Sequence, residues 1–203
     1  AEQELADVRG IVVPGGFGRR GAEGKITCVE YARMHRLPYL GLCYGFQMAV
    51  IEFARHVCNL RQANTTENDP ATPHPVICLL PEQYEIEGIG ASMRLGGRDI
   101  ELASGSQAQM LYEGSRLYDA DRTMIHERFR HRYELNPDYR RTLEAAGLVF
   151  SGWAPDQPIM QVLELPEHPF FVGTQYHPEF TSRPLAPHPL FAGFIDSCIA
   201  DET

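Results

Sequence analysis

The sequence lacks the features that mark secreted, membrane-bound and nucleic-acid-binding proteins. Its five cysteines are odd in number and include no CxxC pair, so we expect reduced thiols and a cytoplasmic location rather than a disulfide framework. No apolar run approaches the roughly 18 residues of a membrane span, and no signal peptide is visible. Acidic residues outnumber basic ones by 27 to 18, and the net charge of -9 argues against nucleic acid and anionic membranes as partners.

The glycine spacing of the P-loop, GxxxxGK[ST], is also missing. A short β-rich run at residues 9–13 ends in the sequence Pro14-Gly15-Gly16-Phe17-Gly18, and residues 16–21 have the spacing GxGxxG, which alone is only a weak indication of a nucleotide. A glycine-rich loop at a strand end still brings backbone N–H groups close to a ligand. The loop therefore indicates a binding role without indicating a nucleotide.

What is present is an alternation of β-rich and helical patterns. Helical patterns at 24–36 and 46–57 follow the β-rich runs at 9–13 and 37–40, and this βαβα order favours a parallel sheet with crossover helices. A length of 203 residues fits a single α/β domain with a sizeable core. We therefore predict one domain over residues 1–203, with an open, mostly parallel central sheet flanked by helices and extended by antiparallel additions.

Two later segments are predicted to supply antiparallel strands. Residues 93–95 and 100–102 are β-rich and flank Gly96-Gly97, which favours a hairpin across the glycines. The segment from His126 to Glu134 packs eight ionisable groups into nine residues. By default it is a solvated edge strand with alternating salt bridges, and a place in a functional site is the alternative.

The sequence Gly41-Leu42-Cys43-Tyr44-Gly45 indicates a nucleophile on a strand-to-helix elbow. Glycine two residues before and two after the cysteine is what a strained turn of this kind requires, because a Cβ there would crowd it. The turn would place the sulfur at the carboxyl end of a strand and at a helix N-terminus, where we expect its pKa to fall. The alternative is a small buried residue at a tight turn.

A base for this cysteine is expected at His177, which follows the last long β-run and should lie at the same sheet edge. Glu179 is two residues further on and could orient the imidazole. Backbone N–H groups of Tyr44 and of the Gly15-Gly16 loop are the predicted oxyanion donors. Taken alone, His177-Pro178-Glu179 is more often a surface turn than part of a triad.

Together these motifs resemble a known family. The class-wide part of the resemblance is Pro14-Gly15-Gly16, Gly41-Leu42-Cys43-Tyr44-Gly45-Phe46-Gln47 and Gln175-Tyr176-His177-Pro178-Glu179. The more specific part is Gly15 to Lys25, Val50 to Arg55, Ala63-Asn64-Thr65-Thr66-Glu67, Met93-Arg94-Leu95-Gly96 and Arg130-His131-Arg132-Tyr133-Glu134. These motifs cover nearly the whole chain in the family's order, and the chain resembles the glutaminase domain of CTP synthase, a class I (triad-type) glutamine amidotransferase with a flavodoxin-like fold.

The resemblance implies hydrolysis of L-glutamine through a γ-glutamyl thioester on Cys43. His177 would protonate the departing ammonia and then activate water, with Glu179 orienting the ring. Glu67 would bind the amino group of glutamine, and Arg132 would bind near its α-carboxylate. In the family, backbone groups of the glycine loop and the elbow hold the rest of the substrate. The corresponding residues of this sequence are Gly16, Tyr44, Gly45, Phe46 and Gln47.

The chain departs from the family at three positions and lacks one domain. Leucine, methionine and histidine usually stand where the sequence has Tyr44, Phe46 and Phe129, and none of the three changes touches the triad. The amidoligase domain that normally precedes in the same chain has no counterpart here. The resemblance implies that ATP, Mg²⁺ and UTP bind that missing domain, that this domain holds no cofactor, and that GTP is an activator, with Gly18 to Lys25 as a candidate contact.

Two other functions stay open at this point. A related γ-glutamyl hydrolase or peptidase, or the glutaminase of another amidotransferase, would share the triad but not the Met93-to-Gly96 and Arg130-to-Glu134 motifs. A catalytically silent domain that binds a nucleotide or a partner would have no need of Cys43, His177 and Glu179. On the resemblance, the isolated chain is expected to be a weak glutaminase.

Overall fold

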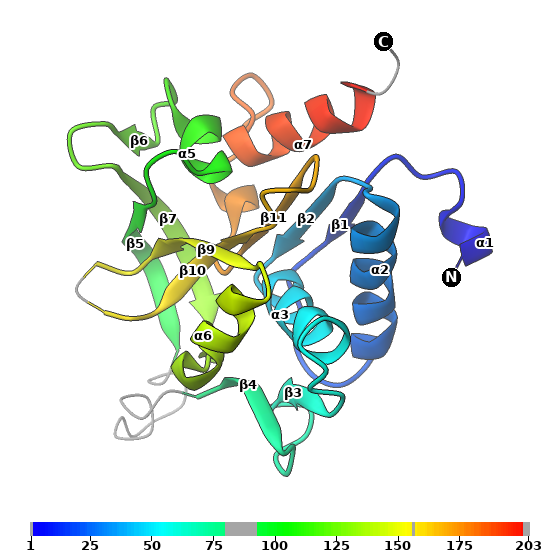
Figure 1. Cartoon of the computed structure of the whole chain (residues 1–203). Helices are drawn as coiled ribbons and strands as arrows, with labels where there is room; N and C mark the ends of the chain where they lie inside the picture. The colour runs from blue at the N-terminus through cyan, green and yellow to red at the C-terminus, as the bar shows by residue number, and fades with distance from the viewer. Residues whose placement is uncertain (1, 80–92, 156, 201–203) are drawn as a thin grey trace.

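The computed structural model describes residues 2–79, 93–155 and 157–200, and an eight-stranded sheet forms its centre (Figure 1). From one edge to the other, the strands are β1 (Ile11–Val13), β2 (Tyr39–Leu42), β11 (Phe171–Thr174), β10 (Met160–Glu164), β9 (Val149–Trp153), β5 (Arg94–Leu102), β7 (Met124–His131) and β6 (Tyr118–Asp119). Within the described parts of the chain, no helix has the length and apolar character that a membrane span requires.

The α/β class is confirmed, but the sheet is mixed rather than mostly parallel. Strand β2 runs parallel to both of its neighbours, β1 and β11. All other pairs in this sheet among the described residues are antiparallel. Strands β9, β10 and β11 follow one another through connections too short for a crossover helix, and short connections permit only antiparallel neighbours. The parallel part is therefore confined to β1, β2 and β11, which precede the glycine loop, Cys43 and His177 respectively.

Helices cover both faces of this sheet (Figure 1). One face carries α2 (Ala22–His35), α3 (Tyr44–His56) and α6 (Pro137–Ala145), and the other carries α5 (Gln107–Tyr112) and α7 (Pro189–Ile199). A short helix, α1 (Glu2–Leu5), precedes β1, and a 3₁₀ turn, η1 (Pro178–Phe180), follows β11. A three-stranded sheet of β3 (Ala63–Thr65), β4 (His74–Cys78) and β8 (Glu134–Leu135) packs beside α3. The architecture is a three-layer α/β/α sandwich.

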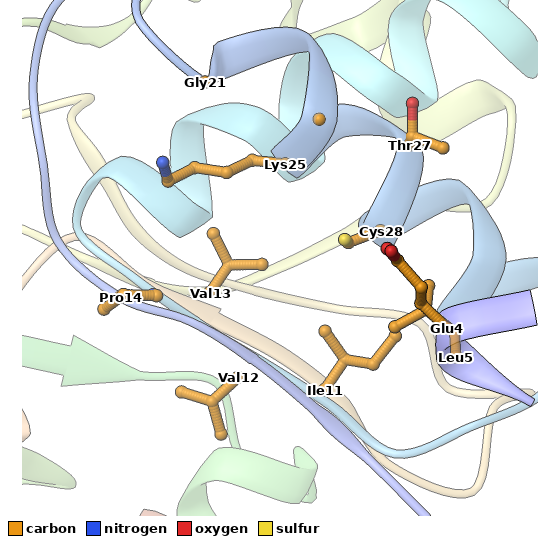
Figure 2. A pocket seen from close by; sticks show the side chains of 11 residues that line it. Glu4, Leu5, Ile11, Val12, Val13, Pro14, Gly21, Lys25, Thr27 and Cys28 are labelled. Atoms are coloured by element: carbon orange, nitrogen blue, oxygen red, sulfur yellow. The ribbon is translucent and has the colours of Figure 1, made fainter. Parts of the chain in front are cut away.

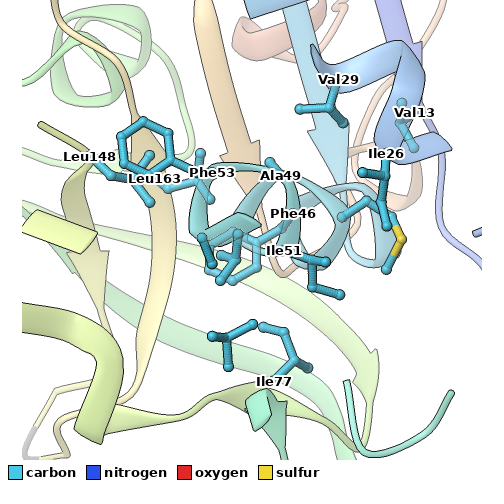
Figure 3. Close-up of a cluster of buried hydrophobic side chains, with 14 of the residues drawn as sticks. Val13, Ile26, Val29, Phe46, Ala49, Ile51, Phe53, Ile77, Leu148 and Leu163 are labelled. Carbon is cyan, nitrogen blue, oxygen red and sulfur yellow. The ribbon is translucent and has the colours of Figure 1, made fainter. Parts of the chain in front are cut away.

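The larger core cluster is centred on α3, which is buried on every side over its first eleven residues. Figure 3 shows its side chains between Val29 and Ile26 of α2 on one flank and Leu148 and Leu163 on the other. A helix that is apolar all round must be covered all round, and here α2, the sheet and the small sheet cover it. The core thereby fixes the N-terminus of α3, directly after Cys43.

Residues 93–102 do not form the predicted hairpin. Residues 94–102 belong to one strand, β5, whose antiparallel register with β7 is unbroken from Arg94–His131 to Glu101–Met124. The ring of His126 lies against Gly97 so closely that a Cβ there would collide with it. The prediction was wrong because glycine serves close packing between strands as well as turns.

The charged segment that begins at His126 lies at the sheet edge, as predicted by default, but it is not fully solvated. Strand β6 pairs only with Met124 and Ile125 of β7, so from His126 onward β5 is the one strand partner of β7 among the described residues. The burial of β7 alternates, so that Glu127, Phe129 and His131 point inward. The outward residues Arg128 and Arg130 are exposed. Three of the eight ionisable groups, Glu127, His131 and Glu134, are buried, which a fully solvated strand would not require. Several residues of the segment surround the site described next.

Candidate active site

Cys43 occupies the predicted elbow between β2 and α3. Its backbone has φ 50 and ψ -93, a positive φ that a non-glycine residue adopts only when its surroundings enforce it. Its N–H donates to the carbonyl oxygen of Thr174 on β11 (2.6 Å), which ties the turn to the neighbouring strand. A Cβ on Gly45 would collide with the carbonyl oxygen of Val13, and one on Gly41 would lie 2.8 Å from the carbonyl carbon of Gly45. Both glycines are thus required by close packing, as predicted.

The Cys43 thiol is not acidified in the way that we expected from the sequence. Burial, with the nearby carboxylates Glu179 and Glu134, raises the pKa of Cys43 to about 12. The N–H of Tyr44 and the side-chain amide of Gln175, which donates to Sγ at 3.6 Å, lower that pKa but do not reverse the shift. Because desolvation outweighs the helix terminus, the resting nucleophile is a neutral thiol that needs a base.

This state predicts a steep pH dependence for reaction with a simple thiol reagent. With a pKa of about 12, only about one Cys43 in 10⁵ is a thiolate at pH 7. We expect alkylation by iodoacetamide, followed by peptide mapping at Cys43, to be slow at pH 7 and to rise about tenfold per pH unit up to at least pH 10. A rate that is fast at pH 7 and reaches its plateau below pH 9 would contradict a protonated resting thiol.

A base lies beside the sulfur in the form of His177. Its Nδ1 is 2.6 Å from Oε1 of Glu179, and its backbone N–H donates to the carbonyl of Arg128 on β7 (2.9 Å). A Cβ built on Gly15 would lie 3.0 Å from Cε1 of His177 and 3.8 Å from Cβ of Cys43, so both side chains adjoin the same point of the glycine loop. The structure thus brings the three predicted triad residues to one place.

Glu179 stays ionised at neutral pH. Burial acts to raise the pKa of this carboxyl, but the hydrogen bond from His177 and the positive charge that the imidazole can carry hold it below its usual value. The ring of Phe180 stacks on His177 with centroids 4.9 Å apart, which further restricts the imidazole. An ionised partner at Nδ1 leaves Nε2 of His177 available for proton transfer.

A cavity of about 570 Å³ opens over these groups. It is lined by Gly16, Phe17, Cys43, Gln47, Glu67, Met93, Arg130, His131, Arg132, Tyr133 and His177. Four of the predicted substrate-binding residues, Gly16, Gln47, Glu67 and Arg132, are therefore in the cavity wall. The other three, Tyr44, Gly45 and Phe46, are not.

Those three residues pack outside the cavity wall and hold the glycine loop, the core and β1 in place. The Tyr44 hydroxyl donates to the carbonyl of Gly18 (2.7 Å) and accepts from the amide of Asn68 (2.8 Å), so this unusual side chain anchors the glycine loop. Phe46 is fully buried in the core. Gly45 packs against the backbone of β1. Only their backbone groups remain available for the predicted substrate role.

Two side chains of opposite charge, Glu67 and Arg132, line the cavity. Oε1 of Glu67 accepts the N–H of Gly18 (3.1 Å), which holds this carboxylate against the glycine loop. Burial raises the pKa of Glu67, while that hydrogen bond and the charge of Arg132 act in the other direction. Arg132 itself is exposed at the mouth of the cavity. One carboxylate and one guanidinium in a single cavity can bind a zwitterion.

Two contacts near the sulfur were missed from the sequence. Gln175 was part of a recognised motif, but only the fold shows that its amide reaches Sγ of Cys43. His131 and Glu134 form a buried pair with Nε2 and Oε1 2.7 Å apart, and His131 lines the cavity. His131 and Glu134 are three residues apart in the charged segment, and this spacing could have indicated that they pair. It becomes informative only with the structure, which shows that alternate residues of β7 are buried.

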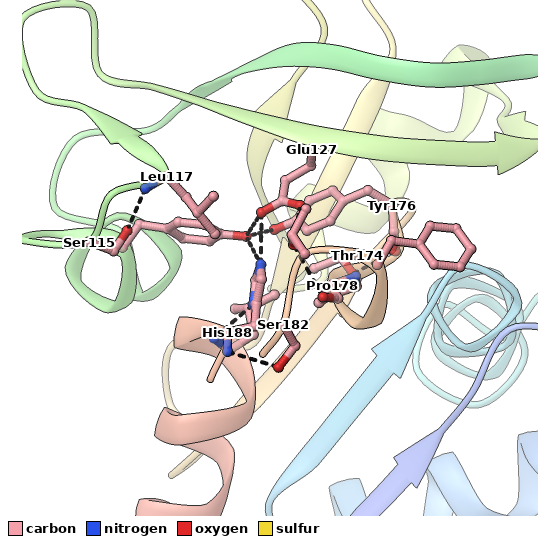
Figure 4. A network of polar contacts seen from close by, with 12 residues as sticks. Ser115, Leu117, Glu127, Thr174, Tyr176, Pro178, Ser182 and His188 are labelled. Atoms are coloured by element: carbon pink, nitrogen blue, oxygen red, sulfur yellow. Dashed lines mark hydrogen bonds and ion pairs between the residues drawn. The ribbon is translucent and has the colours of Figure 1, made fainter. Parts of the chain in front are cut away.

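A buried polar cluster holds the loop that carries His177 and Glu179 (Figure 4). Oε1 of Glu127 accepts from the hydroxyl of Tyr112 (2.9 Å) and from Nε2 of His188 (2.7 Å), and Oε2 accepts from Thr181 (3.2 Å). The Tyr112 hydroxyl also bonds that of Tyr176 (3.0 Å). Tyr176 and Thr181 flank the loop on its two sides, so this cluster clamps it to β7, α5 and α7.

A second cavity lies away from the triad, between α1, β1 and α2 (Figure 2). It measures about 480 Å³ and is lined mainly by apolar groups, with the side chains of Lys25, Glu4 and Cys28 at its walls. None of the predicted catalytic or substrate-binding residues lines it.

The described residues include one group that could hold a metal ion, formed by Glu30, Glu52 and His56. However, Nε of Arg33 donates to both carboxylate oxygens of Glu52, at 3.1 and 3.0 Å. The buried carboxylate is already neutralised, so the group is better explained as an ion-pair network between α2 and α3.

Comparisons with known proteins agree with this geometry. Residues 1–197 match the class-I glutamine amidotransferase family. CTP synthases of Moorella thermoacetica and Caldanaerobacter subterraneus are 54% and 50% identical to this chain over 193 and 198 residues, which cover 95% and 98% of it. Those alignments cover only 34% and 35% of the two relatives, so the chain spans about a third of their length.

A solved structure extends the comparison to three dimensions. The Trypanosoma brucei CTPS glutaminase domain with bound acivicin superposes with a TM-score of 0.88 at 34% sequence identity. The superposition covers 100% of this chain and 75% of that one. The chain therefore belongs to the class I glutamine amidotransferases, among the glutaminase domains of CTP synthases.

Proposed function

We propose that this chain hydrolyses L-glutamine to glutamate and ammonia, with Cys43 as nucleophile, His177 as base and acid, and Glu179 as the group that orients His177. One observation carries the proposal: a strained cysteine and a histidine bound to a carboxylate line the same cavity. A cysteine held in a positive-φ turn next to such a pair is the arrangement that acyl transfer needs.

The chemistry follows from the protonation states. As the sulfur attacks the amide carbon, the thiol proton moves to Nε2 of His177 and a C–S bond forms. His177 then gives its proton to the amide nitrogen, the C–N bond breaks, and ammonia leaves. Water next loses a proton to His177 and attacks the thioester carbonyl, the C–S bond breaks, and glutamate and the thiol are regenerated. The N–H of Tyr44, which already bonds the sulfur, is positioned to stabilise the oxyanion.

Substrate recognition is proposed to follow the charges of the cavity. Glu67 would bind the α-ammonium of glutamine, and Arg132 would bind near its α-carboxylate. Gly16, Gln47 and the backbone of Tyr44, Gly45 and Phe46 would complete the contacts. The presence of both charged groups in one cavity supports this assignment.

We also propose that the ammonia serves an amidoligase domain that converts UTP to CTP. The support is that the similar CTP synthases are about three times as long as the matched region. ATP, Mg²⁺ and UTP would bind that domain, and GTP would act as an activator, with the Gly18-to-Lys25 segment as one contact. The five cysteines are all unpaired thiols, which supports a reducing, cytoplasmic location.

An assay of the purified chain tests the proposed function. We expect glutamate and ammonia to appear in equal amounts from glutamine, slowly, and a much lower rate with γ-glutamyl peptides at the same concentration. Preference for the peptides would favour the γ-glutamyl peptidase alternative. No turnover of either substrate, even after the chain is rejoined to an amidoligase domain, would favour a silent binding domain.

A further inference from the structure

Three buried side chains in the wall of the catalytic cavity each have a polar atom that bonds to nothing in the described chain. These atoms are Nε2 of His177, Oε1 of Gln47 and Nδ1 of His131. The three residues are 8%, 3% and 5% exposed, so their polar atoms are withdrawn from bulk water. Buried polar groups are normally paired, and a cluster of unpaired ones in one cavity points to a ligand that pairs them.

All three atoms can accept hydrogen bonds. His177 and His131 each direct their other ring nitrogen at a carboxylate, and a neutral imidazole that carries its proton on that side keeps a lone pair on the free nitrogen. The Gln47 amide nitrogen donates to the carbonyl of Tyr133 (3.0 Å) and to Oε1 of Gln175 (3.3 Å), so its oxygen is the free atom. The matching ligand must therefore bring donors.

His131 is held firmly in this orientation. Its partner Glu134 is fully buried and also accepts from Nε of Arg94 (2.9 Å) and from the amide of Gln161 (3.5 Å). Burial acts to raise the pKa of Glu134, but the hydrogen bonds from His131 and Arg94 and the charge of Arg94 act to lower it, and the pKa lies below its usual value, so the carboxylate stays charged. The free Nδ1 of His131 is thus a preorganised acceptor.

The pair also lies close to the reacting sulfur. Glu134 is one of the two carboxylates whose charge acts on the Cys43 thiol. Through its amide, Gln47 is bonded to Gln175, and Gln175 donates to the same sulfur. Because His131 and Cys43 line the same cavity, a substrate held for attack by the sulfur can bring a donor group to Nδ1 of His131.

We propose that Nδ1 of His131 accepts a hydrogen bond from the side-chain amide nitrogen of glutamine and from the ammonia that this nitrogen becomes. The inference rests on the proposed function and makes His131 a specificity-determining residue. A primary amide brings two N–H donors to the cavity, and ammonia brings three. A carboxylate or an ester at the same place brings none and would leave the acceptor unpaired.

The test uses two replacements of His131 that separate this role from a structural one. In His131→Gln, the side-chain amide reaches Glu134 as Nε2 does, and the Nδ1 acceptor is lost. In His131→Asn, the shorter side chain can present its oxygen where Nδ1 stood, and the bond to Glu134 is lost. Each variant is assayed with glutamine and with glutamate γ-methyl ester, whose leaving group has no N–H donor.

We expect His131→Gln to lower kcat/KM for glutamine about tenfold, while kcat/KM for the ester stays within twofold of the parent. His131→Asn should retain more of the preference for glutamine over the ester than His131→Gln does. Equal losses of kcat/KM on both substrates in His131→Gln would show a structural role. So would a larger loss of the preference for glutamine over the ester in His131→Asn than in His131→Gln. Either result would overturn this inference and leave the proposed function standing. A parent chain that cleaves neither substrate would overturn the proposed function and this inference with it.

Discussion

Replacement of Cys43 by alanine is expected to abolish glutamine hydrolysis, with a loss on the order of 10³-fold or more. The reason is that no other thiol of the chain lines the catalytic cavity, so no second group can form the thioester. Alanine keeps the Cβ and the backbone of the elbow, and the fold should survive. Ammonia release and the thermal unfolding midpoint measure the two effects separately.

Cys28→Ala is the matched control for this variant. Cys28 is also a free thiol, but it lies on α2 at the second cavity and makes no contact with the triad. It should retain full activity. A Cys43→Ala variant that still hydrolyses glutamine at a rate near the parent would contradict the assignment of the nucleophile.

Gly45→Ala is expected to lower the free energy of unfolding by about 2–3 kcal/mol, the upper part of the usual range for an overpacked core. The new methyl group would collide with the carbonyl oxygen of Val13, a backbone atom that no side-chain rotation can move aside. Strand β1 would have to shift away from α3 and β2. Urea unfolding followed by circular dichroism measures the change.

Gly24→Ala provides the contrast within the same fold. Gly24 lies in helix α2, and a Cβ there meets nothing within 4 Å. We expect this variant to gain up to about 1 kcal/mol from helix propensity. If Gly45→Ala proved as stable as Gly24→Ala, the close contact between the elbow and β1 would not exist as described.

The elbow and the triad could be predicted from sequence because each depends on residues close together in the chain. The spacing of Gly41, Cys43 and Gly45 encodes the turn, and His177 and Glu179 are two residues apart. That Cys43 and His177 lie close together could be predicted from the rule that parallel strands present their carboxyl ends at one edge of the sheet. The β2–β11 pairing satisfied that rule.

Other features depend on long-range packing and escaped prediction. Burial raises the pKa of Cys43, whereas its place at a helix N-terminus predicts a lower pKa. The extent of burial cannot be read from the local sequence. The pair Gly96-Gly97 looked like a turn because the sequence does not reveal that a neighbouring histidine needs the space. The roles of Gln175 and His131 likewise follow from which residues β7 and β11 bring to the sulfur.

The most direct measurement of the central claim is the site of covalent labelling by an electrophile shaped like glutamine. The chain is incubated with the reagent at neutral pH, digested, and mapped by mass spectrometry, with and without excess glutamine. We predict a single adduct on the peptide that contains Cys43, and we expect excess glutamine to suppress its formation. An adduct on another cysteine, or a chain that stays unmodified, would contradict it.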